Sequence, residues 1–397
     1  MPVRFAKRLV SYGFRKLFRL FAKFPRQSEV IVFESFHGKQ YSCNPRAIYE
    51  YMKEQYPGYT FYWSLNKASI PLVAHHNLPV LQRFTFKWIY TMATAKYWVI
   101  NTRMPRWMQK PEGTVFLQTW HGTPLKKLGL DIEDVKMPGT TTELYRKNFT
   151  DETGRWDYLI APNSYSRDIF RQAFAFNGNM IESGYPRNDV LYTQNQPPTV
   201  IFLKSQMGLP TDKKIILYAP TWRDDEYIEV GKYSFQLKLD LQAMKAALGD
   251  DFVLLLRMHY LIADHMDLTG FEDFAYNMSG YEDIRDLYLV SDVLITDYSS
   301  VYFDYANLKR PVIFYTYDLE NYRDSLRGFY VDIERTAPGP LVTTTEQVIE
   351  ELQSLRERTA SHKMEEFNER YCAWEDGRAT ERVVQEVFGP PSQSAPI

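Results

Sequence analysis

Cysteine and long apolar segments are both scarce in this sequence. Cys43 and Cys372 are the only cysteines among 397 residues, so neither a disulfide framework nor a cysteine-based metal site can be assembled. No apolar run approaches the roughly 20 residues that cross a bilayer, and Arg15, Lys16 and Arg19 interrupt the N-terminal segment where a signal peptide needs an apolar centre. We therefore expect a chain that stays in a reducing cytoplasm and does not span a membrane.

The sequence also lacks an excess of charge and the common nucleotide-binding signatures. Its 47 basic side chains face 49 acidic ones, for a formal net charge of −2, which argues against a nucleic acid partner. The strings G-x-x-x-x-G-K-S/T, G-x-G-x-x-G and G-x-S-x-G are missing. Their absence argues against a P-loop NTPase, a nicotinamide enzyme and an esterase.

Length and composition instead indicate a two-domain globular enzyme. A chain of 397 residues exceeds what one hydrophobic core usually supports. Hydrophobic residues make up 45% and charged residues 24%, as in average globular proteins. Aromatic residues reach 16%, with 29 Tyr and 25 Phe, so some rings are expected at surfaces or at a membrane boundary.

The first 26 residues predict a basic amphipathic helix. They contain eight basic residues and no acid, the first carboxylate being Glu29. At about 100° per residue, the basic residues gather on one side and an apolar stripe on the other. The stripe consists of Val10, Phe14, Leu17, Leu20, Phe21 and Phe24. Such a helix can lie on an anionic bilayer; the alternative is a helix that packs its stripe on the protein.

Short apolar runs alternate with helical patterns along the rest of the chain, and this alternation predicts an α/β fold with parallel sheets. A polar, Pro-rich segment at 194–198 places the domain boundary near residue 195. The segment 345–388 is expected to be helical, and 389–397 to be a disordered tail. The strands are expected at 30–33, 60–63, 97–101, 114–118, 158–161, 215–218, 252–256, 293–296 and 312–315.

Polar residues that can bind phosphate groups follow several of these strands. Ligands of parallel sheets bind at this place, beyond the carboxyl ends of the strands. His121 and Gly122 follow the strand at 114–118, and Arg257, Met258 and His259 follow the strand at 252–256. Two other strand ends supply the residues Thr221, Trp222, Arg223, Asp297, Ser299, Ser300 and Asp304. Hydroxyl and guanidinium groups bind phosphate oxygens, and a histidine can take a proton from an attacking hydroxyl.

Some of these residues allow a second interpretation. Ser299 and Ser300 can serve only to cap a helix, and a single histidine is more often structural than catalytic. His121 and His259, however, lie at equivalent strand ends in different halves, so a cleft between two domains would bring them together. Asp297 and Asp304 could hold a divalent cation, although cationic neighbours could neutralise phosphates without one. No recognised zinc spacing is present.

Taken together, these motifs resemble the CDP-glycerol glycerophosphotransferase family of teichoic acid enzymes. The resemblance covers residues 30 to 380. The matching strings are FESFHGKQYSCNP (33–45), QTWHGTPLKKLGLD (118–131), SGYPRND (183–189), YAPTWRDD (218–225), LLRMHY (255–260) and ITDYSSVYFDYANLKRP (295–311).

The resemblance implies a GT-B type fold, in which two Rossmann-like parallel-sheet domains face each other across a cleft. It implies an acceptor-side domain over 27–195 and a CDP-donor domain over 196–365, after the membrane-association helix at 1–26. A C-terminal helix at 366–388 would cross back to the first domain.

The family also implies roles for individual residues. His121 would activate the acceptor hydroxyl, and His259 would be the second catalytic histidine. Substrate-binding residues would be Trp120, Gly122, Thr123, Pro124, Leu125, Lys126, Arg187, Thr221, Trp222, Arg223, Arg257, Met258, Asp297, Ser299, Ser300 and Asp304.

The implied reaction moves glycerol phosphate from CDP-glycerol to a hydroxyl of an undecaprenyl-diphosphate-linked acceptor, with release of CMP. The enzyme would be peripheral, at the cytoplasmic face of the bacterial cell membrane, and could contact other teichoic acid enzymes. No metal or other cofactor is required by the resemblance, and a divalent cation is left open. The length resembles a short form without a long N-terminal extension.

Alternatives to this function remain at this level. A ribitol phosphate transferase using CDP-ribitol would share the motifs, and a nucleotide-sugar glycosyltransferase would share the fold. A non-catalytic membrane scaffold that binds anionic polymer is a third alternative. The number of units added and the oligomeric state are not predicted.

Overall fold

A computed structural model of the protein describes residues 2–135, 140–221, 227–229, 232–233, 237–258, 267–321, 328–355 and 362–391. The chain divides into two compact units, described separately below. The first contains Met1–His121, Leu128–Asp189 and Trp374–Ile397; the second contains Gly122–Lys127 and Val190–Ala373. The second unit thus begins shortly before the boundary predicted near residue 195.

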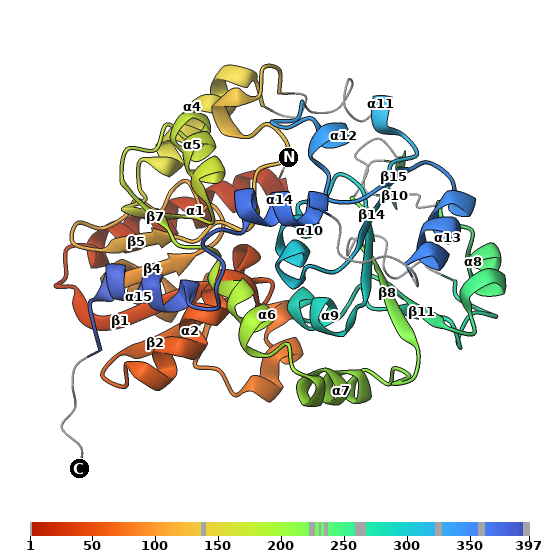
Figure 1. The fold of residues 1–397 in the computed structure, drawn as a ribbon. Coiled ribbons are helices and arrows are strands. Elements are labelled where there is room, and N and C mark those ends of the chain that lie inside the picture. Colours follow the sequence, from red (N-terminus) through yellow and green to blue (C-terminus); the bar gives the residue numbers. More distant parts are fainter. Residues whose placement is uncertain are drawn as a thin grey trace, which may run out of the picture. The chain divides into compact units, whose positions relative to one another are not determined.

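The first unit is built on a seven-stranded parallel sheet, with strand order β3-β2-β1-β4-β5-β6-β7 among the described residues (Figure 1). Val32 of the interior strand β1 lies between Tyr62 of β2 and Trp98 of β4. The strands are β1 (Gln27–Glu34), β2 (Thr60–Leu65), β3 (Val80–Gln82), β4 (Ala95–Ile100), β5 (Val115–Gln118), β6 (Tyr158–Ala161) and β7 (Asn179–Glu182).

Helices cover both faces of this sheet because alternate side chains of each strand point to opposite faces. Val32 and Trp98 belong to a core that includes residues of α1, α3 and α5, whereas Ile31 and Val99 belong to a core shared with α2 and α15. Helices and 3-10 turns of this unit are α1 (Pro2–Phe21), η1 (Phe36–Gly38), α2 (Cys43–Gln55), η2 (Lys67–Ser69), η3 (Pro71–His76), α3 (Phe86–Thr94), η4 (Gly129–Asp131), α4 (Thr142–Thr153), α5 (Ser164–Ala173), η5 (Pro186–Asn188) and α15 (Ala379–Phe388).

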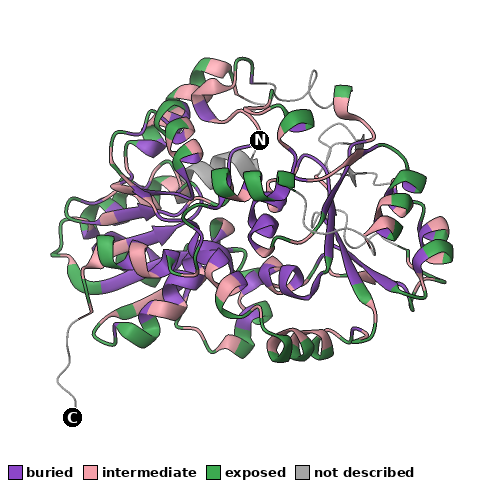
Figure 2. Cartoon of the chain, in the orientation of Figure 1, coloured by how far each residue is buried: buried purple, intermediate pink, exposed green. Residues whose placement is uncertain are grey.

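The second unit contains a six-stranded parallel sheet of order β12-β11-β8-β13-β14-β15 in the described part. Its central strands are buried, except for Lys214 at the start of β8, as the purple ribbon in Figure 2 shows. The strands are β8 (Lys214–Tyr218), β11 (Phe252–Leu256), β12 (Ala275–Asn277), β13 (Val293–Thr296), β14 (Val312–Tyr315) and β15 (Leu341–Val342), and a separate antiparallel pair is β9 (Tyr227–Glu229) with β10 (Lys232–Tyr233).

Helices assigned to the second unit include several short ones near strand ends. They are α6 (Asp189–Thr193), α7 (Pro197–Gln206), α8 (Leu241–Leu248), α9 (Ile284–Val290), α10 (Val301–Tyr305), η7 (Ala306–Leu308), α11 (Leu319–Asn321), α12 (Ile333–Thr336), α13 (Thr345–Ser354) and α14 (His362–Tyr371). Asp189, the first residue of α6, still belongs to the first unit. The two parallel α/β units confirm the predicted fold class.

The N-terminal segment forms the predicted helix, but much of its apolar stripe packs on the protein. Phe18 and Phe21 are 1% and 8% exposed and join the core beneath α3. Phe14 and Leu17 pack against the same core. Part of the stripe therefore packs on the protein, as the alternative interpretation predicts, and membrane association of the segment stays a prediction. None of the helices in the described chain is both long and apolar enough to cross a bilayer.

The segment 366–388, predicted as one returning helix, contains two separate elements. The end of α14 belongs to the second unit, whereas α15 belongs to the first and contacts α2. Figure 1 shows α15, coloured blue, among the red and orange elements. Gly377 lies between them with a φ of +82°, which is outside the range of a right-handed helix and is incompatible with one continuous helix. Of the tail predicted at 389–397, residues 392–397 lie outside the described residues.

Candidate active site

The strand order of the first sheet reverses beside β1, whose neighbours are β2 on one side and β4 on the other. Ligands of open parallel sheets bind at such a point, beyond the carboxyl ends of the strands. Asn101 follows β4, and the segment at 119–121 follows the next strand, β5. His121 is therefore placed beside the switch point of its own unit.

His121 is held in one orientation by a backbone carbonyl. Its Nδ1 lies 2.7 Å from the carbonyl oxygen of Asn101, so Nδ1 carries the proton and donates it to that oxygen. Among the described residues no group is hydrogen-bonded to Nε2. The lone pair of a neutral imidazole is thus left on Nε2, where it can accept a proton from a substrate hydroxyl.

The surroundings of His121 keep its imidazole neutral. Desolvation by nearby protein atoms lowers its pKa to about 4, the bond to Asn101 opposes this, and the charges of Arg187 and His37 lower it further. His121 nevertheless keeps exposed surface, so the desolvation reflects a concave surrounding and not enclosure. A bound phosphate would favour the imidazolium and raise the pKa during turnover.

The indole ring of Trp120 stacks on the imidazole ring of His121. Its ring centroid lies 4.7 Å from that of His121, with 29° between the planes, and 4.6 Å from that of Phe174. Trp120 has a φ of 51°, an unusual conformation for a large side chain that is found at functional sites. Its backbone N–H donates to the side chain of Gln118. The contacts assign Trp120 a positioning role; its predicted contact with substrate stays a prediction.

Asn44 joins the two loops that carry His121 and Arg187. Its Nδ2 donates to the carbonyl oxygens of Thr119 and Trp120 at 3.0 and 3.2 Å, and its Oδ1 accepts the N–H of Arg187 at 3.1 Å. Arg187 is 5% exposed, and its guanidinium carbon lies 4.2 Å from the ring centre of Tyr185. The structure therefore brings the predicted residues His121 and Arg187 into one network. Sequence reasoning missed Asn44.

A second histidine of this unit, His37, was also missed. It follows β1, and Phe36 and His37 have φ values of 47° and 59°. Their N–H groups donate to the side chains of Asn101 and Thr102, while the Phe36 ring lies 5.7 Å from that of His121. Applying the strand-end argument to 30–33 could have found His37, because it lies just beyond that run.

The second sheet has its own switch point, between β8 and β13. Thr221 follows β8 and Asp297 follows β13, and the Thr221 N–H donates to Asp297 Oδ1 at 2.7 Å. Asp297 and Asp304 are buried, whereas Ser299 and Ser300 keep partial exposure. The two serines thus present hydroxyl groups at the strand end where the sequence predicted a phosphate-binding site.

Arg257 and Met258 are engaged within the second unit itself. Arg257 Nη1 donates to the carbonyl oxygens of Met278, Ser279 and Tyr281 at 2.6 to 2.8 Å. Desolvation lowers the pKa of this arginine. Met258 is 4% exposed and packs in the core. These contacts favour structural roles, and donor binding by either side chain stays a prediction.

The residues after His121 belong to the second unit. The N–H of Lys127 donates to the carbonyl of Gly328, and Leu125 accepts the N–H of Tyr330. Thr123 and Leu125 are buried. Pro124 and Lys126, which were also predicted to bind substrate, lie with them in the segment Gly122–Lys127. A Cβ added at Gly122 would lie 3.0 Å from the Ser300 Oγ. This segment and the predicted serine site therefore lie close together within one unit.

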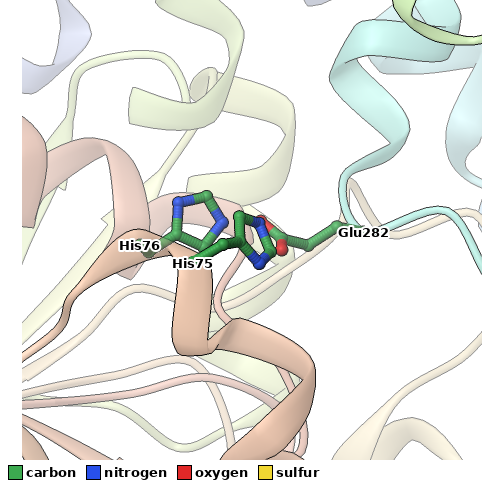
Figure 3. A group of neighbouring side chains, drawn as sticks. All are labelled: His75, His76 and Glu282. Atoms are coloured by element: carbon green, nitrogen blue, oxygen red, sulfur yellow. The ribbon is translucent and has the colours of Figure 1, made fainter.

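Three predicted site residues, Trp222, Arg223 and His259, lie outside the described residues. The predicted convergence of His121 and His259 is accordingly not described. Within either unit by itself, no three potential metal ligands gather in the described chain. Figure 3 draws His75 and His76, whose rings are 4.1 Å apart at the end of η3, together with Glu282 of the second unit.

Comparison with known proteins agrees with this geometry. The family model of CDP-Glycerol:Poly(glycerophosphate) glycerophosphotransferase matches residues 16–389. The chain belongs to this family. The match covers both units and the predicted site residues within them.

Named relatives point the same way. The chain is 52% identical over 385 residues to the teichoic acid poly(glycerol phosphate) polymerase of Bacillus subtilis, covering 96% of this chain but 51% of that protein. It is 48% identical to the teichoic acid glycerol-phosphate transferase of Staphylococcus aureus, covering 96% of this chain and 98% of the relative. The teichoic acid ribitol-phosphate primase of Bacillus spizizenii is 31% identical.

A solved structure supports the GT-B type fold. A structure of the wall teichoic acid polymerase TagF, a histidine variant soaked with CDPG, superimposes with a TM-score of 0.88 at 42% identity. The match covers 96% of this chain and 95% of that chain. The predicted family and fold are confirmed by these comparisons.

Proposed function

We propose that this member of the family transfers glycerol phosphate from CDP-glycerol to a hydroxyl of a lipid-linked teichoic acid acceptor. His121 Nε2 takes the proton of the acceptor hydroxyl, whose oxygen bonds to the β-phosphorus of the donor. The bond from that phosphorus to the bridging oxygen breaks, and CMP leaves. The observation that carries the proposal is the fixed tautomer of His121, which places an available base in an accessible site.

The second unit is proposed to bind the donor. Its switch point presents Thr221, Ser299 and Ser300 beyond the ends of β8 and β13, and hydroxyl and backbone N–H groups at such loops bind phosphate oxygens. The first unit, which carries His121, would then bind the acceptor. His259, Trp222 and Arg223 remain proposed donor-side residues because of the family resemblance.

Release of CMP from CDP-glycerol, measured with His121→Gln and the control His75→Gln, tests the catalytic role. Loss of a general base is expected to slow the reaction by about 10²–10⁴-fold, whereas the exposed His75 should be dispensable. Both variants should bind lipid vesicles like the original protein. Equal turnover by His121→Gln and the original protein would favour the scaffold alternative.

Offering several donors tests the substrate. CDP-glycerol is expected to be used in preference to CDP-ribitol, because the relatives named for glycerol phosphate are more similar than the ribitol-phosphate primase. The masses of the products show whether glycerol phosphate or ribitol phosphate was transferred. Turnover only with UDP- or GDP-sugars would support the glycosyltransferase alternative.

The enzyme is also proposed to bind an anionic membrane through its first unit. The apolar residues Leu20, Phe24, Phe86 and Tyr90 are exposed by 53, 45, 63 and 38%. Phe24 and Tyr90 have centroids 6.4 Å apart, and the buried Phe21 contacts both Phe86 and Tyr90. We call these four residues, one leucine and three aromatic residues, the apolar patch. Lys16, Arg19 and Lys23 of the same N-terminal segment are exposed, so rings and cations can contact a bilayer together.

Sedimentation with anionic vesicles tests this surface. The variant Phe24→Ser/Phe86→Ser should bind vesicles less strongly, because two exposed rings are lost while the buried Phe18 and Phe21 remain. The control Leu72→Ser changes a residue that is 70% exposed elsewhere in the first unit and should bind normally. If the double variant sediments with vesicles like the original protein, these exposed rings do not bind the membrane and the N-terminal segment has only a structural role.

A further inference from the structure

A pocket of about 290 Å³ lies within the first unit, beside the loops that hold His121. It is lined by His37, Arg83, Arg103, Met104, Pro105, Arg106, Asn148 and Glu152. We call it the arginine pocket. Its walls come from the loops after β1 and β4, which flank the switch point, and from α4. Its volume is close to the lower end for ligand sites, and suits a small charged group better than a whole nucleotide.

The pocket carries positive charge that its own acids do not neutralise. Glu152 forms an ion pair with Arg155 and accepts the N–H of Met104 at 3.0 Å. Arg103 and Arg106 are exposed, and no carboxylate of the described residues forms an ion pair with either. Two guanidinium groups therefore remain for a ligand, and guanidinium groups pair well with phosphate oxygens.

Arg83 has a different role in the pocket. It is 8% exposed and pairs with the buried Glu34, with 3.3 Å between Nε and Oε2. It also donates to the carbonyl oxygen of His37. Arg83 thus fixes the wall that contains His37.

Two further observations indicate an anion. The Asn148 Nδ2 is buried at the pocket wall without a hydrogen-bond partner, although buried polar groups usually have one. The pKa of His37 is lowered, first by desolvation and then by the charges of Arg83, Arg103 and Lys39. An unpaired donor and a positive potential both suit a negatively charged ligand.

We propose that the arginine pocket binds a phosphate ester of the acceptor substrate, with Arg103 and Arg106 as its charged groups. This inference rests on the proposed function, since it assigns the acceptor to the unit that carries His121. Phe36 and Asn101 contact both the His121 ring and the loops of the pocket. A phosphate held there would keep the acceptor's reacting end near the base. The phosphate can be the terminal phosphodiester of an attached glycerol unit or the diphosphate of the lipid carrier.

Direct binding tests the pocket without any turnover. Calorimetry would compare a short oligo(glycerol phosphate) added to the original full chain, to Arg103→Gln/Arg106→Gln, and to the control Lys53→Gln/Lys67→Gln. The control removes the same charge from exposed positions of the first unit outside the pocket. The pocket variant should raise Kd at least about tenfold, the effect of losing one charge-assisted hydrogen bond. If the Kd of oligo(glycerol phosphate) is unchanged, the same titration with inorganic pyrophosphate decides whether the pocket binds the diphosphate of the carrier instead. Unchanged Kd values for both probes, or an equal loss in both variants, overturn the proposal.

Kinetics with two acceptors identifies the source of the phosphate. One acceptor carries a terminal glycerol phosphate, and the other ends at the disaccharide on the lipid diphosphate. A higher KM for only the first acceptor assigns the terminal phosphodiester, and a higher KM for both assigns the carrier diphosphate. A higher KM for CDP-glycerol with unchanged acceptor KM overturns the proposal. If the original protein releases no CMP, the proposed function fails while calorimetry still decides the pocket.

Discussion

Removing the Asn44 side chain should disconnect the candidate base from Arg187. Asn44 is fully buried and makes three hydrogen bonds, to the carbonyls of Thr119 and Trp120 and from the N–H of Arg187. Asn44→Ala leaves three main-chain groups without these partners. At about 1 kcal/mol for each bond, the free energy of unfolding of the first unit should fall by about 3 kcal/mol. Trp120, which already has a positive φ, loses one of the three hydrogen bonds of its main chain.

Urea unfolding and CMP-release kinetics together test this reasoning. The control Asn368→Ala also removes an amide that donates to two carbonyls, at 3.1 and 2.9 Å, but within the second unit and outside the hydrogen-bond network of His121. Both variants should be less stable, yet only Asn44→Ala should lose kcat at temperatures where it is fully folded. If the two variants keep equal kcat, Asn44 does not position His121 and the reasoning is refuted.

Two other predictions concern the same unit. Arg187→Gln removes a positive charge that lowers the pKa of His121, so the pKa should rise in the variant. Because the base works when neutral, the acid limb of the pH profile of kcat/KM should move to higher pH. An unmoved acid limb would exclude this coupling. Gly184→Ala should lower Tm by an amount equivalent to about 1–2 kcal/mol or more, because Gly184 has a φ of +79° and a Cβ would lie 2.8 Å from the Trp374 carbonyl oxygen; calorimetric melting of the variant measures this.

The central strands could be predicted from the sequence, whereas the edge strands could not. Each predicted run, such as 252–256, became a buried strand with neighbours on both sides. The four parallel strands that were missed, β3, β7, β12 and β15, are the edges of the two sheets. An edge strand has only one neighbouring strand to cover it, so β7 contains exposed, half-buried and buried residues and does not form a continuous apolar run.

The N-terminal helix shows a related limit. The segment is helical as predicted, but a sequence pattern does not say whether protein or lipid covers the apolar face of a helix. Phe18 and Phe21 face α3 because Trp88, Phe86 and Tyr90 complete a cluster of rings there. At the margin of this cluster, Leu20 and Phe24 of the N-terminal segment and Phe86 and Tyr90 of α3 stay exposed.

The positions of His121, Thr221 and Asp297 could be predicted because each of these residues follows a strand closely; their roles stay predictions. The candidate site was not predictable where a residue acts through a contact distant in sequence. Asn44 reaches Trp120 and Arg187 because α2 begins next to both loops, and no spacing encodes that. Conversely, Arg257 stands at the expected strand end but donates to carbonyls of the neighbouring loop. A charged residue at the end of a strand can thus either bind a ligand or hydrogen-bond to the loop beside it.

Arg103 and Arg106 differ from Arg257 because no described carboxylate pairs with them and both line a cavity. For this reason, replacing Arg103 and Arg106 should weaken substrate binding without unfolding the protein, whereas replacing Arg257 should not have this selective effect.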